Sequence, residues 1–312
     1  MKTPEMTIIV PIFNEQDNII ELQNRLVNVI SELEIDYKIL WVNDGSTDDS
    51  KHIIEKLSLE QDHTYYLNLT RNFGHQIAVS AGLNYMESDC CVIIDGDLQD
   101  PPELIKDLYT EYQKGVDVVY AKRQKRKGEH FLKKITAKLY YRVLKKLVPF
   151  DIPLDTADFR LMSKRVVEAL NNMPEQNKYL RGQVAWLGFP ETHVLYNRDS
   201  RQGGKSGYTI GKMFRLAFDG ITGFSDKPLS FVSRIGFVIS ILSFLMILFA
   251  VFSHFVLKQT ITGWTSLIIT VSFIGGIQLL SVGVIGEYIS RINKNVTQRP
   301  LYMIESENIN KS

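Results

Sequence analysis

The sequence predicts an α/β protein with a mostly parallel sheet, followed by a pair of membrane-spanning helices. Over residues 6–121, short β-branched and apolar runs alternate with helical patterns, which is the rhythm of βαβ units. Farther along the chain, residues 230–290 contain only three charged side chains, Arg234, Lys258 and Glu287. So apolar a stretch suits a lipid environment.

Five strands are expected in the first region, each a short apolar run: Thr7–Ile12, Lys38–Asn43, Tyr65–Thr70, Cys90–Ile94 and Val116–Tyr120. Helical patterns separate these runs: one capped by Asn14 or Asp17 and ending near Leu33, one ending at Leu57, His75–Met86, and one opened by Pro101 and Pro102 and ending near Lys114. Proline suits a first helical turn because the N–H it lacks has no partner there. In such sheets ligands bind beyond the carboxyl ends of the strands, so the polar residues that follow each run are the candidate site.

The apolar region divides into two segments, Ile235–Leu257 and Trp264–Gly286. Each has 23 residues and no Lys, Arg, Asp or Glu, enough to cross a hydrocarbon core of about 30 Å as a helix. The short link Lys258–Gly263 makes them a hairpin; the alternative is a pair of helices buried in a soluble core. More basic residues flank the outer ends than the turn: Lys227, Arg234, Arg291, Lys294 and Arg299. The positive-inside rule therefore predicts a protein with two membrane spans and with both termini and the first domain in the cytoplasm.

Charge is unevenly distributed along the chain. The net charge of +1 and the mean hydropathy of −0.07 look ordinary, yet residues 122–146 carry eleven Lys or Arg and one acid, Glu129. We interpret this stretch as a basic amphipathic helix that contacts membrane lipids, with a solvated helix face as the alternative. The chain as a whole has no excess of basic residues, so its charge gives no indication of a nucleic-acid partner. The only cysteines, Cys90 and Cys91, are adjacent in an apolar run and read as buried thiols.

Two carboxylates follow the fourth expected strand, in the sequence Asp95-Gly96-Asp97. Carboxylates two residues apart on a tight turn can hold a hard divalent cation, and Mg²⁺ or Mn²⁺ prefers such oxygen ligands and often bridges to substrate phosphates. Gln99 adds a neutral oxygen on the same loop. The sequence predicts a metal site here, although an isolated Asp-x-Asp is more often a surface turn or a helix cap.

Other polar residues follow the first three expected strands. Asp44 can accept hydrogen bonds from a base or ribose, or cap the next helix. Pro11, Asn14 and Glu15 leave the first strand near the same edge. Arg71 precedes a helix start that suits an anion, with a structural ion pair as the alternative reading.

Several motifs occur in a fixed order along the chain: P-I-F-N-E, V-N-D-G-S-T-D, T-R-N-F-G-H-Q, D-G-D-L-Q-D-P-P-E, D-F-R-L-M and R-x-x-R-x-x-G-x-S-x-Y. As an ordered set they resemble the inverting family 2 glycosyltransferases with a GT-A fold. The resemblance covers nearly the whole chain, including the apolar hairpin. It is strongest to the polyprenyl-phosphate glycosyltransferases, among them the bactoprenol glucosyltransferases.

The resemblance implies a role for each candidate residue. Pro11, Asn14, Glu15, Asp44 and Arg71 would bind the nucleotide sugar. Asp95, Asp97 and Gln99 would hold Mg²⁺ or Mn²⁺ on the donor diphosphate. Asp158 would be the catalytic carboxylate, acting as a base or only orienting the sugar, with Asp155 as a second carboxylate nearby. The phosphate and lipid-phosphate contacts would be Arg123, Arg198 and Arg201. Many relatives carry Lys where this chain has His75, which puts a phosphate contact there in doubt.

The resemblance also implies the location, the reaction and the partners. The location would be the bacterial inner membrane, as a multi-pass protein with its catalytic domain in the cytoplasm. The enzyme would transfer a hexose from a nucleotide sugar, with UDP-glucose favoured over UDP-N-acetylglucosamine, UDP-galactose or GDP-mannose, to undecaprenyl phosphate at the inner membrane face. The product would be a lipid-linked sugar for cell-surface glycan modification, and the protein a homo-oligomer, by resemblance a tetramer. A nucleotide diphosphate leaving group sheds negative charge, which a bound cation assists as a Lewis acid.

The expected division of the chain has four parts: a cytoplasmic GT-A domain at 1–208, a juxtamembrane amphipathic helix at 209–228, two transmembrane helices within 229–290 and a cytoplasmic tail at 291–312. The glycine-rich loop from Arg201 to Tyr208 is expected as a lid or as a flexible linker. Two other readings stay open: a processive polysaccharide synthase, disfavoured because no Q-x-x-R-W motif is present, and a membrane-anchored nucleotide-sugar sensor without activity. A Rossmann dehydrogenase is disfavoured because no G-x-G-x-x-G follows the first strand.

Overall fold

The computed structural model describes residues 4–124, 156–196, 227–255 and 263–309. They contain an eight-stranded mixed sheet in the order β7-β5-β6-β4-β1-β2-β3-β8. The strands are β1 (Met6–Ile12), β2 (Tyr37–Asn43), β3 (Thr64–Leu69), β4 (Cys90–Ile93), β5 (Val118–Arg123), β6 (Thr156–Ser163), β7 (Glu191–Tyr196) and β8 (Ile304–Glu307). All run parallel to one another except β6 and β8. The predicted α/β fold with a mostly parallel sheet is therefore confirmed.

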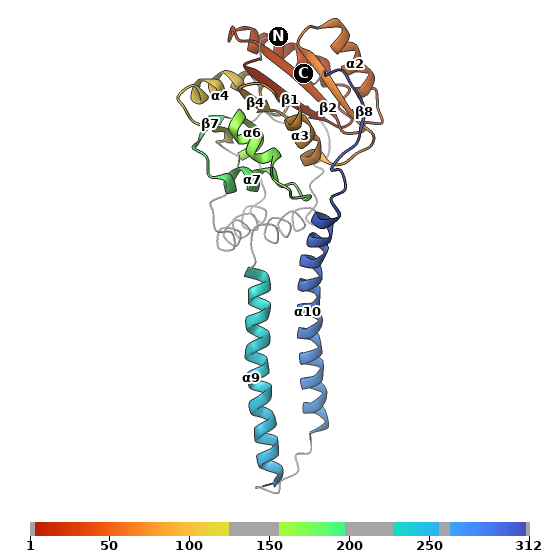
Figure 1. Ribbon diagram of the computed structural model, residues 1–312, viewed down its shortest axis with the longest axis vertical. Helices are drawn as coiled ribbons and strands as arrows, with labels where there is room; N and C mark the ends of the chain where they lie inside the picture. The colour runs from red at the N-terminus through yellow and green to blue at the C-terminus, as the bar shows by residue number, and fades with distance from the viewer. Residues whose placement is uncertain (1–3, 125–155, 197–226, 256–262, 310–312) are drawn as a thin grey trace.

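Helices cover both faces of this sheet (Figure 1). One core contains residues of α1 (Ile19–Ser31), α2 (Ser50–Glu60) and α4 (Ile105–Tyr112), the last preceded by the single-turn 3₁₀ helix η1 (Pro102–Leu104). The other core contains residues of α3 (His75–Asn84), α6 (Lys164–Asn171) and α7 (Leu180–Leu187). Alternate residues of β1 enter opposite cores, Ile8 one and Ile9 the other. Burial on both faces explains why the strands read as continuous apolar runs.

The expected elements of this region are found, with shifted ends. The fifth strand extends to Arg123 rather than ending at Tyr120, so Lys122 and Arg123 lie in the strand instead of following it. The prediction that Asn14 or Asp17 caps the first helix is wrong. Residue Asn18 precedes α1 and forms no side-chain capping bond, while the Asn14 side chain accepts a hydrogen bond from the Thr47 backbone N–H at 2.8 Å.

Strand β6 was not anticipated as a separate element. It lies between β4 and β5 and pairs antiparallel with both, for example Ile93 opposite Arg160. An antiparallel strand begins at the edge where its parallel neighbours end. The start of β6, with Asp158, therefore lies at the same edge as the carboxyl ends of β4 and β5. We call this edge the rim.

The segment expected as a tail at 291–312 instead contributes the end of a helix and a strand of the sheet. Helix α10 (Trp264–Thr297) continues through its first residues, and the chain then returns to form β8 beside β3. Side chains reinforce the pairing: Lys51 Nζ lies 2.6 Å from Glu305 Oε1, and Asn68 Nδ2 donates to Ser306 Oγ at 3.0 Å.

Two long helices, α9 (Lys227–Phe255) and α10, extend side by side away from the sheet (Figure 1). They are 29 and 34 residues long, so each outlasts its expected apolar segment. Within the described ranges, one segment is long and apolar enough to cross a membrane, Phe273–Thr297, and none of it is buried. Leu229–Ile239 is a shorter apolar segment. Residues 209–226 of the expected juxtamembrane helix, the loop at 201–208 and residues 125–146 of the basic stretch lie outside the described residues. Residues 227 and 228 of that expected helix are instead the start of α9.

Candidate active site

The loop after β4 carries the two predicted metal carboxylates, and its shape depends on a close approach to β1. A Cβ on Gly96 would lie 2.7 Å from Ile12 Cγ2, so only glycine fits without a shift. The backbone N–H of Gln99 donates to Asp97 Oδ1 at 3.1 Å and closes the turn. Asp95 and Asp97 are thus held on one short turn at the rim, as the sequence predicts.

Asp95 lies in an environment that disfavours its negative charge. Its Oδ1 atom is buried and has no hydrogen-bond partner. The His75 Nε2 atom lies 3.6 Å from it. Burial raises the pKa of Asp95 to about 6, and the neighbouring carboxylates Asp158, Asp97 and Asp100 add to the rise while His75 opposes it. A carboxylate in this position gains stability from any further cation brought close to it.

This loop fits a hard divalent cation. Its donors are oxygens, which Mg²⁺ and Mn²⁺ prefer, and Asp95 Oδ1 is buried with no hydrogen-bond partner. Among the described residues, no group of three or more His, Cys, Asp or Glu side chains is arranged to hold a metal. Two carboxylates and an amide leave coordination positions for substrate phosphate oxygens, which is how Mg²⁺ is often bound.

Asp158 is held by two arginines. Arg181 of α7 forms a two-pronged ion pair with it, Nε to Oδ1 at 2.8 Å and Nη2 to Oδ2 at 3.0 Å. Arg160 lies two residues along β6 and also donates from Nη2 to Asp158 Oδ1 at 3.0 Å. Successive side chains on a strand alternate in direction, so residues two apart share a face. The Arg160 side chain is only 2% exposed, which makes this a largely desolvated cluster.

These partners keep Asp158 ionised. Burial favours the neutral acid, but the charges of Arg181 and Arg160 and the contact with His75 outweigh it and hold the pKa of Asp158 well below its usual range. A carboxylate with so low a pKa is a weak proton acceptor near neutral pH. The arrangement suits a fixed negative charge better than a general base.

His75 connects the two carboxylate groups. Its Nε2 atom lies 3.5 Å from Asp158 Oδ2 and 3.6 Å from Asp95 Oδ1. Burial opposes protonation of the ring, but the contact with Asp158 and the charge of Asp95 outweigh it and raise the pKa of His75. In this structure His75 therefore contacts two carboxylates. The sequence analysis had considered a phosphate contact at this position.

Asp44 organises the neighbouring part of the rim. It is 3% exposed, and its two oxygens accept the backbone N–H groups of Phe73 at 2.7 Å and Gly74 at 2.9 Å. Gly45 has a positive φ of 65°, and a Cβ there would lie 2.3 Å from the Arg71 carbonyl carbon. The loops after β2 and β3 are therefore in direct contact, and Asp44 fixes the start of α3 at His75.

The other predicted nucleotide-sugar residues also lie at the rim. Pro11 is the next-to-last residue of strand β1, and the Glu15 backbone N–H donates to Ser50 Oγ at 3.0 Å. Asn14 bonds to the loop after β2, as described above. The Arg71 guanidinium stacks on the Phe73 ring at 4.1 Å. No ion pair of Arg71 is found among the described residues, so the structural ion-pair reading is not supported there.

The predicted phosphate-binding arginines are only partly described. Arg123 is the last residue of β5, paired with Tyr196 of β7, and its side chain is not described. Arg198 and Arg201 lie outside the described residues, as does Asp155.

The sequence analysis assigned no role to four side chains that shape this site: Arg160, Arg181, Tyr196 and Asp100. Arg160 and Arg181 hold Asp158, and the hydroxyl of Tyr196 donates to the buried carboxylate of Asp100, three residues after Asp97. The spacing of Asp158 and Arg160 signals a shared strand face. No local signal links Arg181 to Asp158 or Tyr196 to Asp100, since these contacts join separate elements.

The fold and the rim define an α/β enzyme with an acidic, oxygen-rich site at the carboxyl ends of its strands. The sequence model of glycosyl transferase family 2 matches residues 7–170. The chain is 44% identical over 301 residues to an uncharacterized glycosyltransferase of Bacillus subtilis, YkcC, covering 96% of this chain and 93% of that one. It is 37% identical over 303 residues to the bactoprenol glucosyl transferase of Shigella phage SfX, covering 97% of this chain and 99% of that one.

The chain belongs to glycosyl transferase family 2. The predicted resemblance to bactoprenol glucosyltransferases and the prediction of a glycosyltransferase enzyme are both confirmed, and the mixed, mostly parallel sheet is GT-A-like. Among solved structures, the chain is similar to a glucosyl-3-phosphoglycerate synthase from Mycobacterium tuberculosis in complex with Mn²⁺, UDP and phosphoglyceric acid. That similarity has a TM-score of 0.49 and 16% identity, covering 70% of this chain and 76% of that chain.

Proposed function

We propose that the protein transfers a hexose from a nucleotide sugar, with UDP-glucose as the favoured donor, to undecaprenyl phosphate at the cytoplasmic face of the membrane. The observation that carries the proposal is the rim cluster of Asp95, Asp97, His75 and Asp158 in a family 2 glycosyltransferase. Near full-length similarity to proteins named bactoprenol glucosyl transferase supports the lipid acceptor and the glucosyl donor.

The donor site would lie along the ends of β1, β2, β3 and β4. Pro11, Asn14, Glu15, Asp44 and Arg71 would bind the nucleoside part, on the rim that ligands use in open α/β sheets. Asp95, Asp97 and Gln99 would hold Mg²⁺ or Mn²⁺ against the donor diphosphate. When bound, that cation would neutralise charge on the departing diphosphate.

Asp158 would act as a fixed charge beside the transferred sugar. Sugar transfer passes through a transition state with positive charge at the anomeric carbon, and an ionised carboxylate at this position would stabilise it. The acceptor phosphate is already anionic and needs little deprotonation, which agrees with the low pKa of Asp158. A single displacement would invert the anomeric carbon and give a β-linked lipid sugar from an α-linked donor.

The two reacting groups are both anionic, so cations must lower their repulsion. Arg123, Arg198 and Arg201 would supply this charge and position the lipid phosphate, since guanidinium groups bind phosphate oxygens in pairs. The basic stretch at 122–146 would contact anionic headgroups around the acceptor.

We propose that α9 and α10 form a membrane hairpin with both chain ends in the cytoplasm. Their apolar segments and mutual contact support this, as does the apolar, unburied segment Phe273–Thr297 of α10. The domain division would then be catalytic residues 1–208, a juxtamembrane helix at 209–228 and the hairpin within 229–290, with β8 returning to the catalytic sheet. We propose a homo-oligomer, a tetramer by resemblance, which cross-linking in intact membranes would test.

A panel of radiolabelled nucleotide sugars tests the reaction. Full-length protein in detergent would be incubated with undecaprenyl phosphate, Mg²⁺ or Mn²⁺, and UDP-glucose, UDP-N-acetylglucosamine, UDP-galactose or GDP-mannose in turn. We expect organic-soluble product with UDP-glucose and a β-anomeric signal in its NMR spectrum. Label in the lipid fraction with none of the four donors would contradict the proposal.

Matched variants separate the metal and carboxylate roles in this assay. Asp97→Ala and EDTA should each lower the rate at least about 100-fold, because the Lewis acid contributes several kcal/mol. Asp62→Asn, an exposed carboxylate before β3, should leave the rate within about twofold. Full activity in EDTA would remove the metal from the proposal while leaving the transfer reaction intact.

The topology is tested by cysteine labelling in whole cells. Both native cysteines are buried, so background labelling by a membrane-impermeant maleimide should be low. Lys258→Cys should react from outside, and Glu60→Cys, at the exposed last residue of α2, only after lysis. The opposite pattern would invert the topology, and labelling of neither before lysis would argue against a hairpin.

A further inference from the structure

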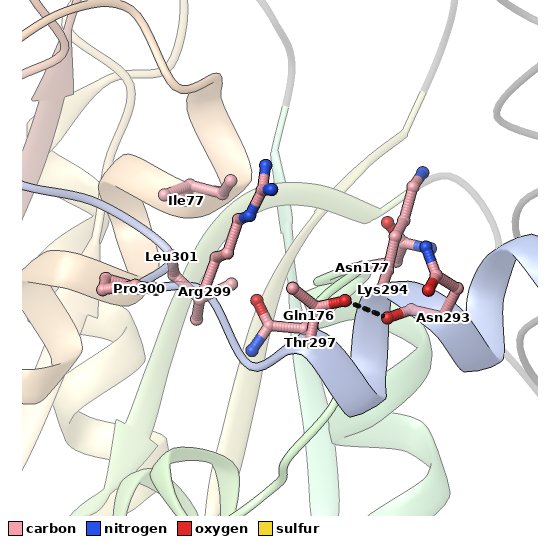
Figure 2. A pocket seen from close by; sticks show the side chains of 9 residues that line it. All are labelled: Ile77, Gln176, Asn177, Asn293, Lys294, Thr297, Arg299, Pro300 and Leu301. Atoms are coloured by element: carbon pink, nitrogen blue, oxygen red, sulfur yellow. Dashed lines mark hydrogen bonds between the residues drawn. The ribbon is translucent and has the colours of Figure 1, made fainter.

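A cavity of about 320 Å³ lies where α10 meets the catalytic unit. Four segments line it: the first turn of α3 at Ile77, the loop with Gln176 and Asn177, the end of α10 at 293–297, and the extended residues 299–301 (Figure 2). We call it the α10 cavity. It is outside the rim residues described above, although Ile77 is only two residues after His75.

The α10 cavity is lined by cations and neutral amides. Lys294 and Arg299 both extend along it in Figure 2, and none of its nine lining residues is acidic. Neither of these two side chains has an ion-pair partner among the described residues. Two unpaired cations beside amide N–H donors form a setting that favours an anion with several oxygens, such as a phosphate group.

Hydrogen bonds fix the walls of the α10 cavity. The Gln176 backbone N–H donates to Asn295 Oδ1 at 3.1 Å, which ties the α6–α7 loop to the helix. Thr297 Oγ donates to the Asn293 carbonyl at 2.6 Å, the dashed line in Figure 2. Gln298 then ends α10 in a left-handed conformation, φ 47°, and the chain turns so that Arg299 lines the same hollow as Lys294.

The position of the cavity along α10 matches the polar layer of a bilayer, a step that rests on the proposed membrane hairpin. Trp264 begins α10, and tryptophan favours the membrane interface. Lys294 lies about 30 residues, or about 45 Å, farther along the helix. A bilayer with its headgroups is about 40–45 Å thick, so Lys294 would lie at the headgroup layer on the catalytic side.

We propose that the α10 cavity binds the phosphate group of a membrane lipid through Lys294 and Arg299. Two sources share this chemistry, the headgroup of an anionic phospholipid and the terminal phosphate of a polyprenyl phosphate held before reaction. Either ligand would hold the catalytic unit at a fixed height over the bilayer, because Ile77 and the Gln176 loop complete the same cavity.

Direct binding to full-length protein in detergent tests the proposal without reference to sugar transfer. The probes are dioctanoyl phosphatidylglycerol, farnesyl phosphate and inorganic phosphate, each titrated onto wild type and the double variant Lys294→Gln/Arg299→Gln. A basic residue near anionic lipid contributes about fivefold in affinity, so we expect the double variant to bind its lipid about 30-fold more weakly. The probe that shows this loss identifies the source.

A charge-matched control completes the test. Lys56→Gln/Lys114→Gln also removes two exposed cations, from α2 and from the turn after α4, and should bind all probes like wild type. Nucleotide-sugar binding should be unchanged in both double variants, which would show that both fold. Equal affinity of wild type and Lys294→Gln/Arg299→Gln for every probe would overturn the proposal. Loss for inorganic phosphate alone would also overturn it, since it would indicate a soluble anion site.

The outcome is separable from that of the proposed function. A protein that transfers sugar normally but shows no loss of lipid affinity in the variant lacks only the cavity site. A protein that transfers no sugar with any donor, yet loses lipid affinity in the variant, retains the cavity site and lacks the proposed reaction.

Discussion

Arg181 of α7 donates two parallel hydrogen bonds, of 2.8 and 3.0 Å, to the two carboxylate oxygens of Asp158. The pair joins an element of one covering layer to the first residues of β6. It leaves the carboxylate 16% exposed at the rim, charged and fixed in direction. The planar guanidinium of arginine can hold both oxygens of the Asp158 carboxylate at once. A lysine, with its single ammonium group, could not fix the carboxylate in the same orientation.

Arg181→Lys should lower kcat about 100-fold while donor affinity changes little. Lysine keeps the positive charge but loses the paired hydrogen bonds to both Asp158 oxygens, so the carboxylate would shift. A misplacement of about 1 Å can lower the rate about 100-fold. Steady-state kinetics and isothermal titration of the donor nucleotide would measure the two effects. Arg165→Lys, in the ion pair with Asp117 away from the rim, is the matched control and should keep kcat within about twofold. A near wild-type kcat in Arg181→Lys would show that the paired hydrogen bonds to Asp158 are not needed.

His75→Lys should retain most activity, whereas His75→Ala should lose about 10- to 100-fold in kcat/KM. The ring nitrogen lies between Asp95 and Asp158, and a cation there reduces repulsion between two carboxylates. Lysine can supply the same charge; alanine cannot. His52→Ala, exposed on α2, controls for loss of a histidine. Equal activity of the alanine and lysine variants would exclude a charge-bridging role.

Tyr196→Phe should weaken metal activation about tenfold with a smaller change in kcat. The Tyr196 hydroxyl donates to Asp100, which is 1% exposed and ends the loop of Asp95 and Asp97. Removing one donor from a buried carboxylate costs about 1–3 kcal/mol, and the metal loop would loosen. Metal titration of the transfer rate would show the shift. Tyr109→Phe removes a weaker hydroxyl contact, 3.4 Å to Glu5, and should leave metal activation unchanged; the same response in both variants would contradict the prediction.

Asp117→Asn should destabilise the protein at neutral pH and have little effect in acid. The hydrogen bonds from Arg165 and Ser163 lower the pKa of Asp117 despite its burial. A carboxyl with a lowered folded pKa contributes stability above its unfolded pKa of about 3.9, and this stability is lost as pH falls through the folded pKa. Thermal unfolding in detergent at pH 7 and pH 3 should therefore show a gap in Tm that narrows in acid. Glu168→Gln, which changes an exposed acid of α6 whose side chain has no hydrogen bond or ion pair among the described residues, is the control for loss of an acid. A gap that stays constant or widens toward acid would contradict this assignment.

Sequence patterns were sufficient for the parallel part of the sheet and for its rim. Strands buried on both faces read as unbroken apolar runs, so β1 and β4 could be recognised, and Asp95 and Asp97 follow β4 directly along the chain. Topology then brings the polar residues after neighbouring strands together. This local relation between strand end and site made the metal loop predictable.

Other features depend on contacts between distant segments. Strand β6 mixes charged and apolar residues because its first part faces the site, so its pattern does not resemble a buried strand. The ion pair of Asp158 with Arg181 joins β6 to α7, and no periodicity encodes it. Strand β8 has four residues and depends on β3 for its hydrogen bonds, so it is defined by its partner rather than by its own sequence.

Strand β8 also has a consequence for the order of assembly. The chain must complete α10 before residues 304–307 exist to cover β3, so the edge of the catalytic sheet stays open throughout synthesis of both apolar helices. An open strand edge is a template for pairing with another chain. Residues 304–307, which close this edge of the sheet, are therefore made only after both long helices, and a ribosome that stalls within α10 would leave a nascent chain with an unpaired strand edge.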